Sequence, residues 1–541
     1  MIVLGALAQL VTYYKTGMPT DAGLHLSLFN SSDHVYHSAM ISEIVERFPP
    51  FEPGMYGIVL SNYHYWFDLV TAEFVRVFHF PLFQTQYLGM YFFAAFMLGI
   101  SAYVFSLSII KSKSFIRWML FFLYFGGDAT YWLSFITSHV FDFKVSSVID
   151  NSTIFLDNPP RAFSVIILFI TLYFIFQVSK PVTKKEIFII SLLAGSLIGF
   201  KVYTGILVLS GLGLLAFYNL LAKKDFKILI IFVLACVFSF CIFFPVNANS
   251  GGLFFNPVDR PRDFITYKPF GLNDWDMRWR IYWQHENFLR LFQYGTMMTV
   301  VYFFAQFGVR LLGLIPYKKT FHILGVEKEI FIYGSMTFLF LVGLFFNQSA
   351  NPGESYNFFV AGGIFLTILS SLFLSQFLEK KPKIFQVLII IIVLGVSIPR
   401  WVYVHAYYLP YYSLSADFLG VGNEEMKTYT FLKNVDQNNL VLILNKNNFD
   451  QNSPLVYALT DKKMFLSGQK VLRDHAALSK DRTEVVETMR TTSDLDVFLE
   501  TARKYNIDYV YLYRNDSIRL DLKKIERYKV FENKVARIFK L

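Results

Sequence analysis

The chain has 541 residues, of which 54% are hydrophobic and 19% aromatic, whereas only 17% are charged. Soluble globular proteins average about 25% charged residues, so this composition excludes an ordinary soluble enzyme and indicates a membrane protein. The net charge of +10 would suggest a nucleic-acid partner in a soluble protein, but most of the excess lies in short connections between apolar runs. Both cysteines, Cys236 and Cys241, lie in one such run, so neither a disulfide framework nor a cysteine metal site is expected.

Lysine clusters alternate with long apolar runs along the chain. They lie in short connections at Lys111 and Lys113, Lys180–Lys185, Lys223–Lys227, Lys318–Lys319 and Lys380–Lys383. The other connections are longer and rich in Asp, His, Asn, Trp and Pro. Because Lys and Arg mark the cytoplasmic side, the alternation predicts a multi-pass protein of a prokaryotic plasma membrane whose long loops face outward.

A helix needs about 20 apolar residues to cross the roughly 30 Å of hydrocarbon in a bilayer. Suitable runs are found at 86–110, 116–137, 161–178, 187–203, 204–221, 228–247, 290–314, 329–346, 358–378 and 384–406. The run over 1–12 is shorter, and we interpret it as the end of a helix whose beginning is missing. Counting it predicts about eleven membrane helices, with the amino terminus in the cytoplasm and the carboxyl terminus outside.

The first outer loop, 13–85, carries the sharpest group of polar residues in the chain. Asp33, His34 and His37 lead into an amphipathic helix predicted from Ala39 to Phe48. Because the two histidines are three residues apart, they share a helical face, with the aspartate at its rim. Spacing alone supplies no third ligand, so the pair is a weak metal signal.

A second amphipathic helix is predicted from Trp66 to Phe78, directly after an aromatic string that contains His64. The two helices would lie on the membrane surface and hold Asp33, His37 and His64 just above the hydrocarbon. There a carboxylate can act as a general base toward a hydroxyl group or bind a hard divalent cation. In the alternative interpretation, Asp33 only caps its helix and the histidines hydrogen-bond interfacial water.

The second outer loop, 138–160, is rich in acidic residues and leads into Arg161. It contains Asp142, Asp150 and Asp157, and acids beside a membrane suit a metal ion or a hydroxyl substrate. Arg161 begins the next apolar run at the outer boundary, where its guanidinium can hold a phosphate through two hydrogen bonds. The alternative is an anchor whose charge reaches the head-group layer.

Two charged residues fall within apolar runs. Asp128 follows a pair of glycines, and Lys201 lies in the glycine-rich stretch between Gly199 and Gly205. An intramembrane charge is a functional hypothesis by default. Lys201 would meet an anionic lipid head group near the outer boundary or pair with Asp128.

The third outer loop, 248–289, combines basic residues with a tryptophan stripe. Its cations are Arg260, Arg262, Lys268, Arg278 and Arg280, and its tryptophans are Trp275, Trp279 and Trp283. The spacing of the tryptophans predicts a helix that anchors itself in the head-group layer. Arg278 and Arg280 either share that role or bind a ligand. A later outer turn, 347–357, adds Glu354 to the same face of the membrane.

The apolar character stops after Trp401, and residues 412–541 are interpreted as a small α/β domain outside the membrane. Segments rich in β-branched and aromatic residues predict strands at Val441–Leu444, Tyr509–Tyr513 and Val530–Phe539. An amphipathic helix is predicted between them, from Leu495 to Tyr505.

Common nucleotide-binding and hydrolase motifs are absent from the sequence. It contains no Walker loop, no dinucleotide glycine motif after a strand, no zincin helix and no Gly-x-Ser-x-Gly elbow. Nucleotide-driven chemistry inside the cell is therefore not predicted.

The arrangement resembles the GT-C superfamily of polytopic membrane glycosyltransferases. The matching features are the long first loop that opens with Asp33, the acidic second loop that runs into Asn158-Pro159-Pro160-Arg161, and the outer α/β domain. The resemblance implies a catalytic transmembrane domain over 1–411 and an extracytoplasmic domain over 412–541. It also implies inverting transfer of a hexose or pentose from a polyprenyl-phosphate-linked donor to a glycan, lipid or protein acceptor at the outer face.

Roles for single residues follow from this resemblance. Asp33 would be the general base or a metal-linked acid, and Asp150 or Asp157 would be the acid of the second loop. Arg161 or Lys201 would contact the donor phosphate. If a divalent cation such as Mg²⁺ or Mn²⁺ takes part, Asp33 and Asp150 would bind it, although the second loop lacks the family's Asp-x-Asp or Glu-x-Asp.

Further candidates come from the residues themselves. They are His34 and His37 beside the base, Arg278 and Arg280 for the donor phosphate, and His64, Asp128 and Glu354 as support for the acceptor. Sugar transfer from a lipid phosphate needs an apolar groove, cations at phosphate depth and a carboxylate that deprotonates the acceptor. The sequence offers all three on one side of the membrane.

Two other classes of function fit the same sequence. One is a transporter or flippase for a lipid-linked or anionic solute, in which Asp128 and Lys201 line the pathway and the helices break near Gly199–Gly205. The other is a polymer-assembly or sensor protein without catalysis, whose outer domain binds glycan. Repeated halves and short outer loops, which are typical of transporters, are not evident in the sequence.

Overall fold

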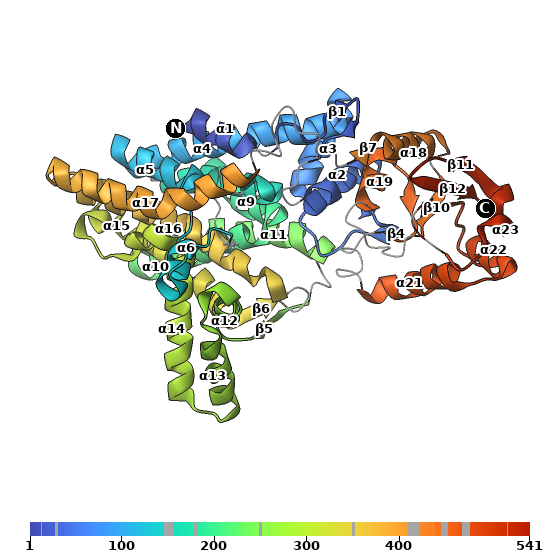
Figure 1. Cartoon of the computed structure of the whole chain (residues 1–541). Coiled ribbons are helices and arrows are strands. Elements are labelled where there is room, and N and C mark those ends of the chain that lie inside the picture. Colours follow the sequence, from blue (N-terminus) through green and yellow to red (C-terminus); the bar gives the residue numbers. More distant parts are fainter. Residues whose placement is uncertain are drawn as a thin grey trace. The chain divides into compact units, whose positions relative to one another are not determined.

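The computed structural model describes residues 1–11, 13–26, 31–144, 155–177, 182–247, 251–348, 352–408, 421–436, 438–444, 453–467, 476–514, 516 and 518–541. The described chain is mostly helical and folds into two compact units (Figure 1). The first consists of Met1–Val11 and Phe93–Pro410, and the second of Thr12–Phe92 and Tyr411–Leu541. The first outer loop therefore folds together with the carboxyl-terminal segment.

Eight helices within the described residues are long and apolar enough to cross a membrane. They are Gln84–Ile109, Pro159–Gln177, Val202–Lys223, Lys227–Asn247, Phe288–Leu314, Lys318–Phe345, Gly353–Leu378 and Lys383–Tyr407. Helix α16 (Tyr356–Leu378) is buried over its whole span, whereas α11 (Lys227–Asn247) and α17 (Lys383–Tyr408) expose most of theirs. The prediction of a polytopic α-helical membrane protein is confirmed, with α16 at the centre of the first unit.

Three predicted runs differ from the helices that they form. The run over 1–12 forms only α1 (Ile2–Leu10). The run over 187–203 forms α9 (Lys184–Phe200), which has the predicted length but lies three residues earlier and is followed by Lys201 in extended conformation. The run over 116–137 is two helices, α5 (Lys113–Tyr124) and α6 (Thr130–Ser138).

The break between α5 and α6 has a clear cause. Gly127 donates its backbone N–H to the carbonyl oxygen of Ser397 at 3.0 Å, and a Cβ on Gly127 would lie 2.5 Å from that oxygen. Directly afterwards, the Asp128 carboxylate accepts the backbone N–H of Thr130, the first residue of α6, at 2.8 Å. A continuous helix would prevent both contacts.

The third outer loop forms α12 (Asp259–Ile265) and α13 (Asn273–Gln284), followed by α14 (Phe288–Phe307). Helices α13 and α14 lie side by side in Figure 1 and project from the other helices of their unit. Trp279 is buried beneath the guanidinium of Arg262, 4.1 Å from its ring, and Trp283 stacks on Trp279 at 5.1 Å. The predicted tryptophan helix is confirmed, but of its tryptophans Trp279 is buried, whereas Trp283 is exposed.

The second unit is built around a sheet that has five strands within the described residues. Their order is β11 (Lys529–Glu532), β12 (Ala536–Lys540), β10 (Tyr509–Tyr513), β8 (Leu440–Ile443) and β9 (Lys463–Met464). The three strands β10, β8 and β9 are parallel, and the β11–β12 hairpin extends the sheet antiparallel at one edge. Helices α21 (Ala476–Thr491) and α22 (Leu495–Lys504) bury their apolar faces in the same hydrophobic core.

Most predicted elements of this domain are confirmed. Strands β8 and β10 and helix α22 lie where they were expected, within one residue at each end. The segment Val530–Phe539, expected as one strand, is a hairpin that turns at Asn533, whose side-chain carbonyl accepts the N–H groups of Val535 and Ala536.

The first outer loop contributes α2 (Ser31–Glu46) and α3 (Trp66–Phe78) to the second unit. Helix α3 has the predicted bounds, whereas α2 begins at Ser31, so Asp33 lies inside its first turn. Helix α2 packs between α3 and α19 (Ser453–Thr460), where the Tyr457 hydroxyl donates to the Glu43 carboxylate. The carboxyl-terminal segment thus holds α2 in place.

Candidate functional site

Asp33, His37 and Asp68 form a chain of charged groups in the second unit. His37 Nδ1 lies 2.9 Å and 3.0 Å from the two carboxylate oxygens of Asp68 in α3. Its Nε2 lies 3.7 Å from Asp33 Oδ2 and 3.3 Å from the Tyr63 hydroxyl. The side chains of His37 and Asp68 are inaccessible to solvent, while that of Asp33 is 21% exposed. Of the three groups, Asp33 is therefore the one that a substrate can reach.

The charge of His37 follows from its two neighbours. Burial lowers its pKa, but the carboxylates of Asp68 and Asp33 outweigh burial and raise the pKa to about 9. His37 is therefore an imidazolium at neutral pH, held between one buried carboxylate and one accessible carboxylate. The ion pair between His37 and Asp33 orients the Asp33 carboxylate.

His34 lies on another side of α2. Its Nδ1 is hydrogen-bonded to the hydroxyl of Tyr91, and its ring packs 5.1 Å from Tyr13 and 5.5 Å from Tyr91. It is buried, and burial lowers its pKa to about 3, so the ring is neutral. We interpret His34 as a residue that fixes α2 against its aromatic neighbours, which differs from the catalytic role expected from the sequence.

His64 joins the group around His37 through an aromatic stack. The rings of Tyr63 and His64 lie 5.0 Å apart and nearly parallel, and Tyr63 in turn reaches His37. The predicted association of Asp33, His37 and His64 is thus seen within one unit. Asp68 and Tyr63 were not predicted. An acid beside Phe67 on the buried face of the amphipathic helix α3 was the signal that could have identified Asp68.

Arg161 forms a second cluster, in the first unit. It lies in the first turn of α8 (Pro159–Gln177) and is only 4% exposed. Its Nη2 is 3.3 Å from the Asn357 side-chain oxygen and 3.5 Å from the Tyr356 hydroxyl, at the start of α16. Asn357 donates in turn to Glu354 Oε2 at 2.6 Å. Arg161 and Glu354, both predicted as site residues, are therefore linked through one amide.

The guanidinium of Arg161 is only partly satisfied. Its Nε and Nη1 have no hydrogen-bond partner among the described residues. The guanidinium also forms no ion pair with any of these residues. The two groups that do accept from it, an amide and a phenol, are neutral. A buried cation is costly without a counter-charge, so this arrangement suits an anionic ligand such as a phosphate.

Lys201 and Arg260 lie in elements that meet the same end of α16. Lys201 is buried at the junction of α9 and α10 (Val202–Lys223), two residues before Tyr203, whose ring packs on Phe358 at 4.8 Å. Arg260 in α12 donates to the Ser355 hydroxyl at 3.0 Å. Lys201 was predicted as a phosphate contact, whereas Arg260 was noted only as one cation of its loop.

Arg278 and Arg280 are not brought to this cluster by any contact in the described part of the chain. Arg280 forms a 2.7 Å ion pair with Asp276, which also binds Arg262 at 2.7 Å. Arg278 is exposed and donates to the Tyr294 hydroxyl in α14 at 3.1 Å. Arg278 thus links α13 to α14, whereas Arg280 is paired within α13.

Asp128 takes part in closing the break between α5 and α6. It is buried, accepts from Thr130, and forms a 3.8 Å ion pair with Arg400. From the other side, Arg310 donates to the carbonyl oxygens of Phe122, at 3.2 Å, and Gly126.

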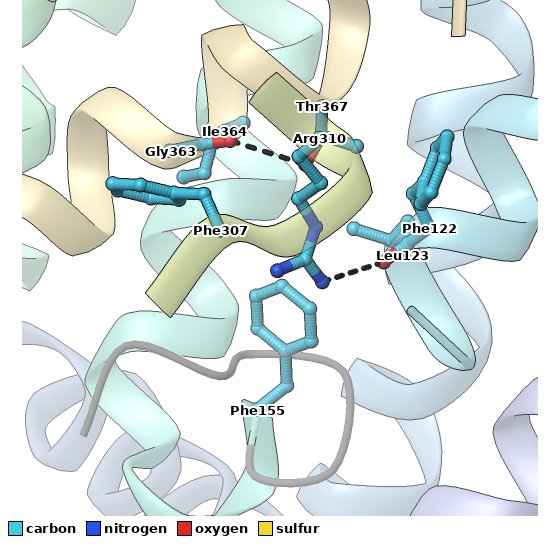
Figure 2. A pocket seen from close by; sticks show the side chains of 8 residues that line it. All are labelled: Phe122, Leu123, Phe155, Phe307, Arg310, Gly363, Ile364 and Thr367. Atoms are coloured by element: carbon cyan, nitrogen blue, oxygen red, sulfur yellow. Dashed lines mark hydrogen bonds between the residues drawn. The ribbon is translucent and has the colours of Figure 1, made fainter. Parts of the chain in front are cut away.

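Figure 2 shows the Arg310 side chain directed toward the backbone of α5, with Phe155 beside it. The adjoining cavity is about 10 Å³, which is too small for more than about one water molecule. We interpret Arg310 and Asp128 as groups that satisfy the free backbone ends of the two half-helices.

The carboxylates do not complete a metal site in the part of the chain that the structure describes. Asp157 ends a short helix, η2 (Phe155–Asp157), just before Arg161, and Asp150 lies outside the described residues. Among the described residues, no group of three or more His, Cys, Asp or Glu side chains is placed to hold a metal ion. The described donors around Asp33 therefore do not form a divalent-cation site by themselves.

No family model matches the chain, and no curated protein sequence matches it either. Solved structures do match. The Archaeoglobus fulgidus oligosaccharyltransferase in complex with Zn and sulfate superposes with a TM-score of 0.53 at 12% sequence identity, covering 95% of this chain and 67% of that chain.

Two further structures match with lower TM-scores. For AglB from Archaeoglobus fulgidus with an inhibitory peptide and a dolichol-phosphate, the TM-score is 0.46 at 11% identity, covering 95% of this chain and 69% of that chain. For the arabinofuranosyltransferase AftD from Mycobacteria, it is 0.48 at 11% identity, covering 100% of this chain and 39% of that chain. The comparison agrees with the resemblance noted in the sequence at the level of the fold: the chain has a fold similar to that of the archaeal oligosaccharyltransferase.

Proposed function

We propose that this protein transfers a sugar from a polyprenyl-phosphate-linked donor to an acceptor at the outer face of the membrane, with inversion at the sugar carbon. The fold supports glycosyl transfer in general, and the two residue clusters supply the groups that the reaction needs. The positive-inside rule, applied to the lysine-rich connections, favours an outer-face position for both clusters.

The observation that carries the proposal is the buried, incompletely paired guanidinium of Arg161. Membrane proteins rarely bury a cation at a helix end without a counter-charge, and those that do mark ligand sites. A phosphate would supply the missing charge and accept from the unpartnered N–H groups of Arg161. Lys201, at the same end of α16, would add a second positive charge.

Asp33 is the base in this proposal. Its carboxylate takes the proton of an acceptor hydroxyl, and the freed oxygen forms a bond to the anomeric carbon of the sugar. The bond between that carbon and the phosphate oxygen breaks from the opposite face, which inverts the configuration. The polyprenyl phosphate leaves with the bonding electrons, and the charge that develops on it is stabilised by Arg161. His37 keeps the carboxylate oriented.

A transporter or flippase is less well supported by the same residues. That alternative required Asp128 as a pathway residue, but Asp128 is engaged by Thr130 and Arg400 at the α5–α6 break.

Binding of the donor lipid tests the proposal before any acceptor is known. Polyprenyl phosphate added to the purified chain should raise its thermal midpoint, because a ligand that binds only the folded state stabilises that state. Arg161→Gln should weaken the apparent affinity by about 10- to 150-fold, which corresponds to the loss of a charged hydrogen bond of about 1.5–3 kcal/mol.

The matched control is Arg117→Gln, because Arg117 is exposed in α5 and belongs to neither cluster. It should leave the shift unchanged. Equal shifts in wild type and Arg161→Gln would remove Arg161 from the donor site and with it the main support for the proposal.

A further inference from the structure

A cavity of about 320 Å³ opens among the helix ends that carry inner-side lysines. Its walls come from α8, α10, α11 and α15 (Lys318–Phe345), all in the first unit. By the positive-inside rule, these ends lie at the cytoplasmic boundary, because they adjoin Lys223–Lys227 and Lys318–Lys319. The cavity is therefore at the opposite end of these helices from Arg161.

The rim of the cavity carries a surplus of positive charge. Three lysines and two carboxylates line it. One of the carboxylates, Glu327, forms a 2.5 Å ion pair with Lys223. The other, Asp225, accepts the backbone N–H of Lys227 at 3.0 Å. Lys227 and Lys328 form no ion pair with any residue that the structure describes.

Lys328 is held in an environment that disfavours a bare charge. Its ammonium is half-buried, 3.3 Å from the carbonyl oxygen of Ser108 and 5.5 Å from the ring of Phe176. A carbonyl oxygen and a phenyl ring stabilise an ammonium only partly, so a bound anion would stabilise the Lys328 charge further.

Part of the cavity wall is apolar. Ile175, Leu215 and Ile228 line the cavity together with the lysines. Helix α11 exposes apolar side chains such as Val233 and Phe240 along most of its span, and in a membrane those faces meet acyl chains. A molecule with an anionic head and an apolar tail fits both parts of this cavity.

We propose that the cavity binds an anionic phospholipid of the inner leaflet, whose phosphate accepts from Lys227 and Lys328 while an acyl chain lies along α11. Basic pockets between membrane helices on the cytoplasmic side bind anionic head groups in this way. The site is separate from the sugar-transfer clusters, so this proposal can be tested independently of the proposed function.

Native mass spectrometry of the full chain in mixed phosphatidylglycerol and phosphatidylcholine micelles tests the site. The wild type should retain one phosphatidylglycerol in preference to phosphatidylcholine. Each lysine near the surface contributes about 1 kcal/mol, or about fivefold, so Lys227→Ala with Lys328→Met should lower the apparent affinity by about 25-fold. Lys318→Ala, an exposed inner lysine outside the cavity, should change it by less than about twofold.

Two further measurements distinguish loss of lipid binding from a folding defect, and lipid binding from binding of a free anion. Lys227→Glu alters only the rim and should lower phosphatidylglycerol retention even if the double variant folds poorly. Inorganic phosphate at the concentration of the lipid should not displace it. Wild-type retention in the lysine variants, or equal displacement by inorganic phosphate, would overturn the proposal.

Discussion

Replacing Arg161 with methionine should raise the stability of the ligand-free protein while removing donor binding. The variant loses two hydrogen bonds to neutral acceptors, at 3.3 Å and 3.5 Å. Bonds of this kind contribute about 0.5–1.5 kcal/mol each. It also removes a buried charge that forms no direct ion pair with a described residue, a desolvation cost of several kcal/mol. Methionine is unbranched and adapts to the same space.

The balance of these terms predicts a gain of about 1–3 kcal/mol in the free energy of unfolding. Unfolding entropy of about 2.1 cal/mol/K per residue converts that gain into a rise of about 1–3 °C in the thermal midpoint for a chain of this size. Thermal unfolding of the purified chain without lipid phosphate measures it directly.

A matched variant should move in the other direction. Arg262 is also buried, but it pairs with Asp276 at 2.7 Å, so Arg262→Met leaves a carboxylate with one partner fewer. That change should lower the free energy of unfolding by about 1–3 kcal/mol. If Arg161→Met destabilises the protein as Arg262→Met does, Arg161 is a structural residue and the reasoning about an anion site fails.

The remaining predictions concern the fold around both clusters. Gly127→Ala should lower the free energy of unfolding by about 1–3 kcal/mol, because the new Cβ would lie 2.5 Å from a backbone oxygen. The control Gly395→Ala should be near neutral, because its Cβ would meet no atom within 4 Å. Equal thermal midpoints of the two variants would contradict this explanation of the α5–α6 break. The pKa of His37 is raised to about 9 in the fold from an ordinary value of 6.5, so its stabilisation is complete below pH 6.5 and is lost as the pH rises through 9. The free energy of unfolding should therefore fall between these pH values by up to about 1.4 kcal/mol per pH unit, and His37→Gln should flatten that slope in thermal unfolding. An unchanged slope would show that another group titrates there.

Local sequence patterns predicted elements whose cause is local. Helix α3 and strand β10 have the predicted bounds because their amphipathic or β-branched patterns decide them without help from distant residues. The break at Gly127 was missed because it depends on Ser397, a partner far away in the sequence that no periodicity reveals. The hairpin at Asn533 was missed because side-chain hydrogen bonds, and not a glycine or proline, make the turn.

The site was predicted in part for the same reason. Asp33 and His37 share a helical face, so their proximity follows from spacing alone. The contacts of His37 with Asp68 and of Arg161 with Asn357 join separate helices, and only the fold brings these side chains together. The sequence also could not separate Arg161 from Arg278, since both are arginines at an outer boundary. Their partners in the structure make the difference.

Sugar transfer in proteoliposomes, with a labelled sugar on polyprenyl phosphate and a mixture of hydroxyl acceptors, tests the central claim most directly. The account predicts turnover by the wild type and by Asp21→Asn, an exposed carboxylate of the same unit. It predicts a loss of about 100-fold or more in Asp33→Asn with an unchanged thermal midpoint, since a general base contributes about 10²–10⁴ in rate. Full turnover by Asp33→Asn would contradict it.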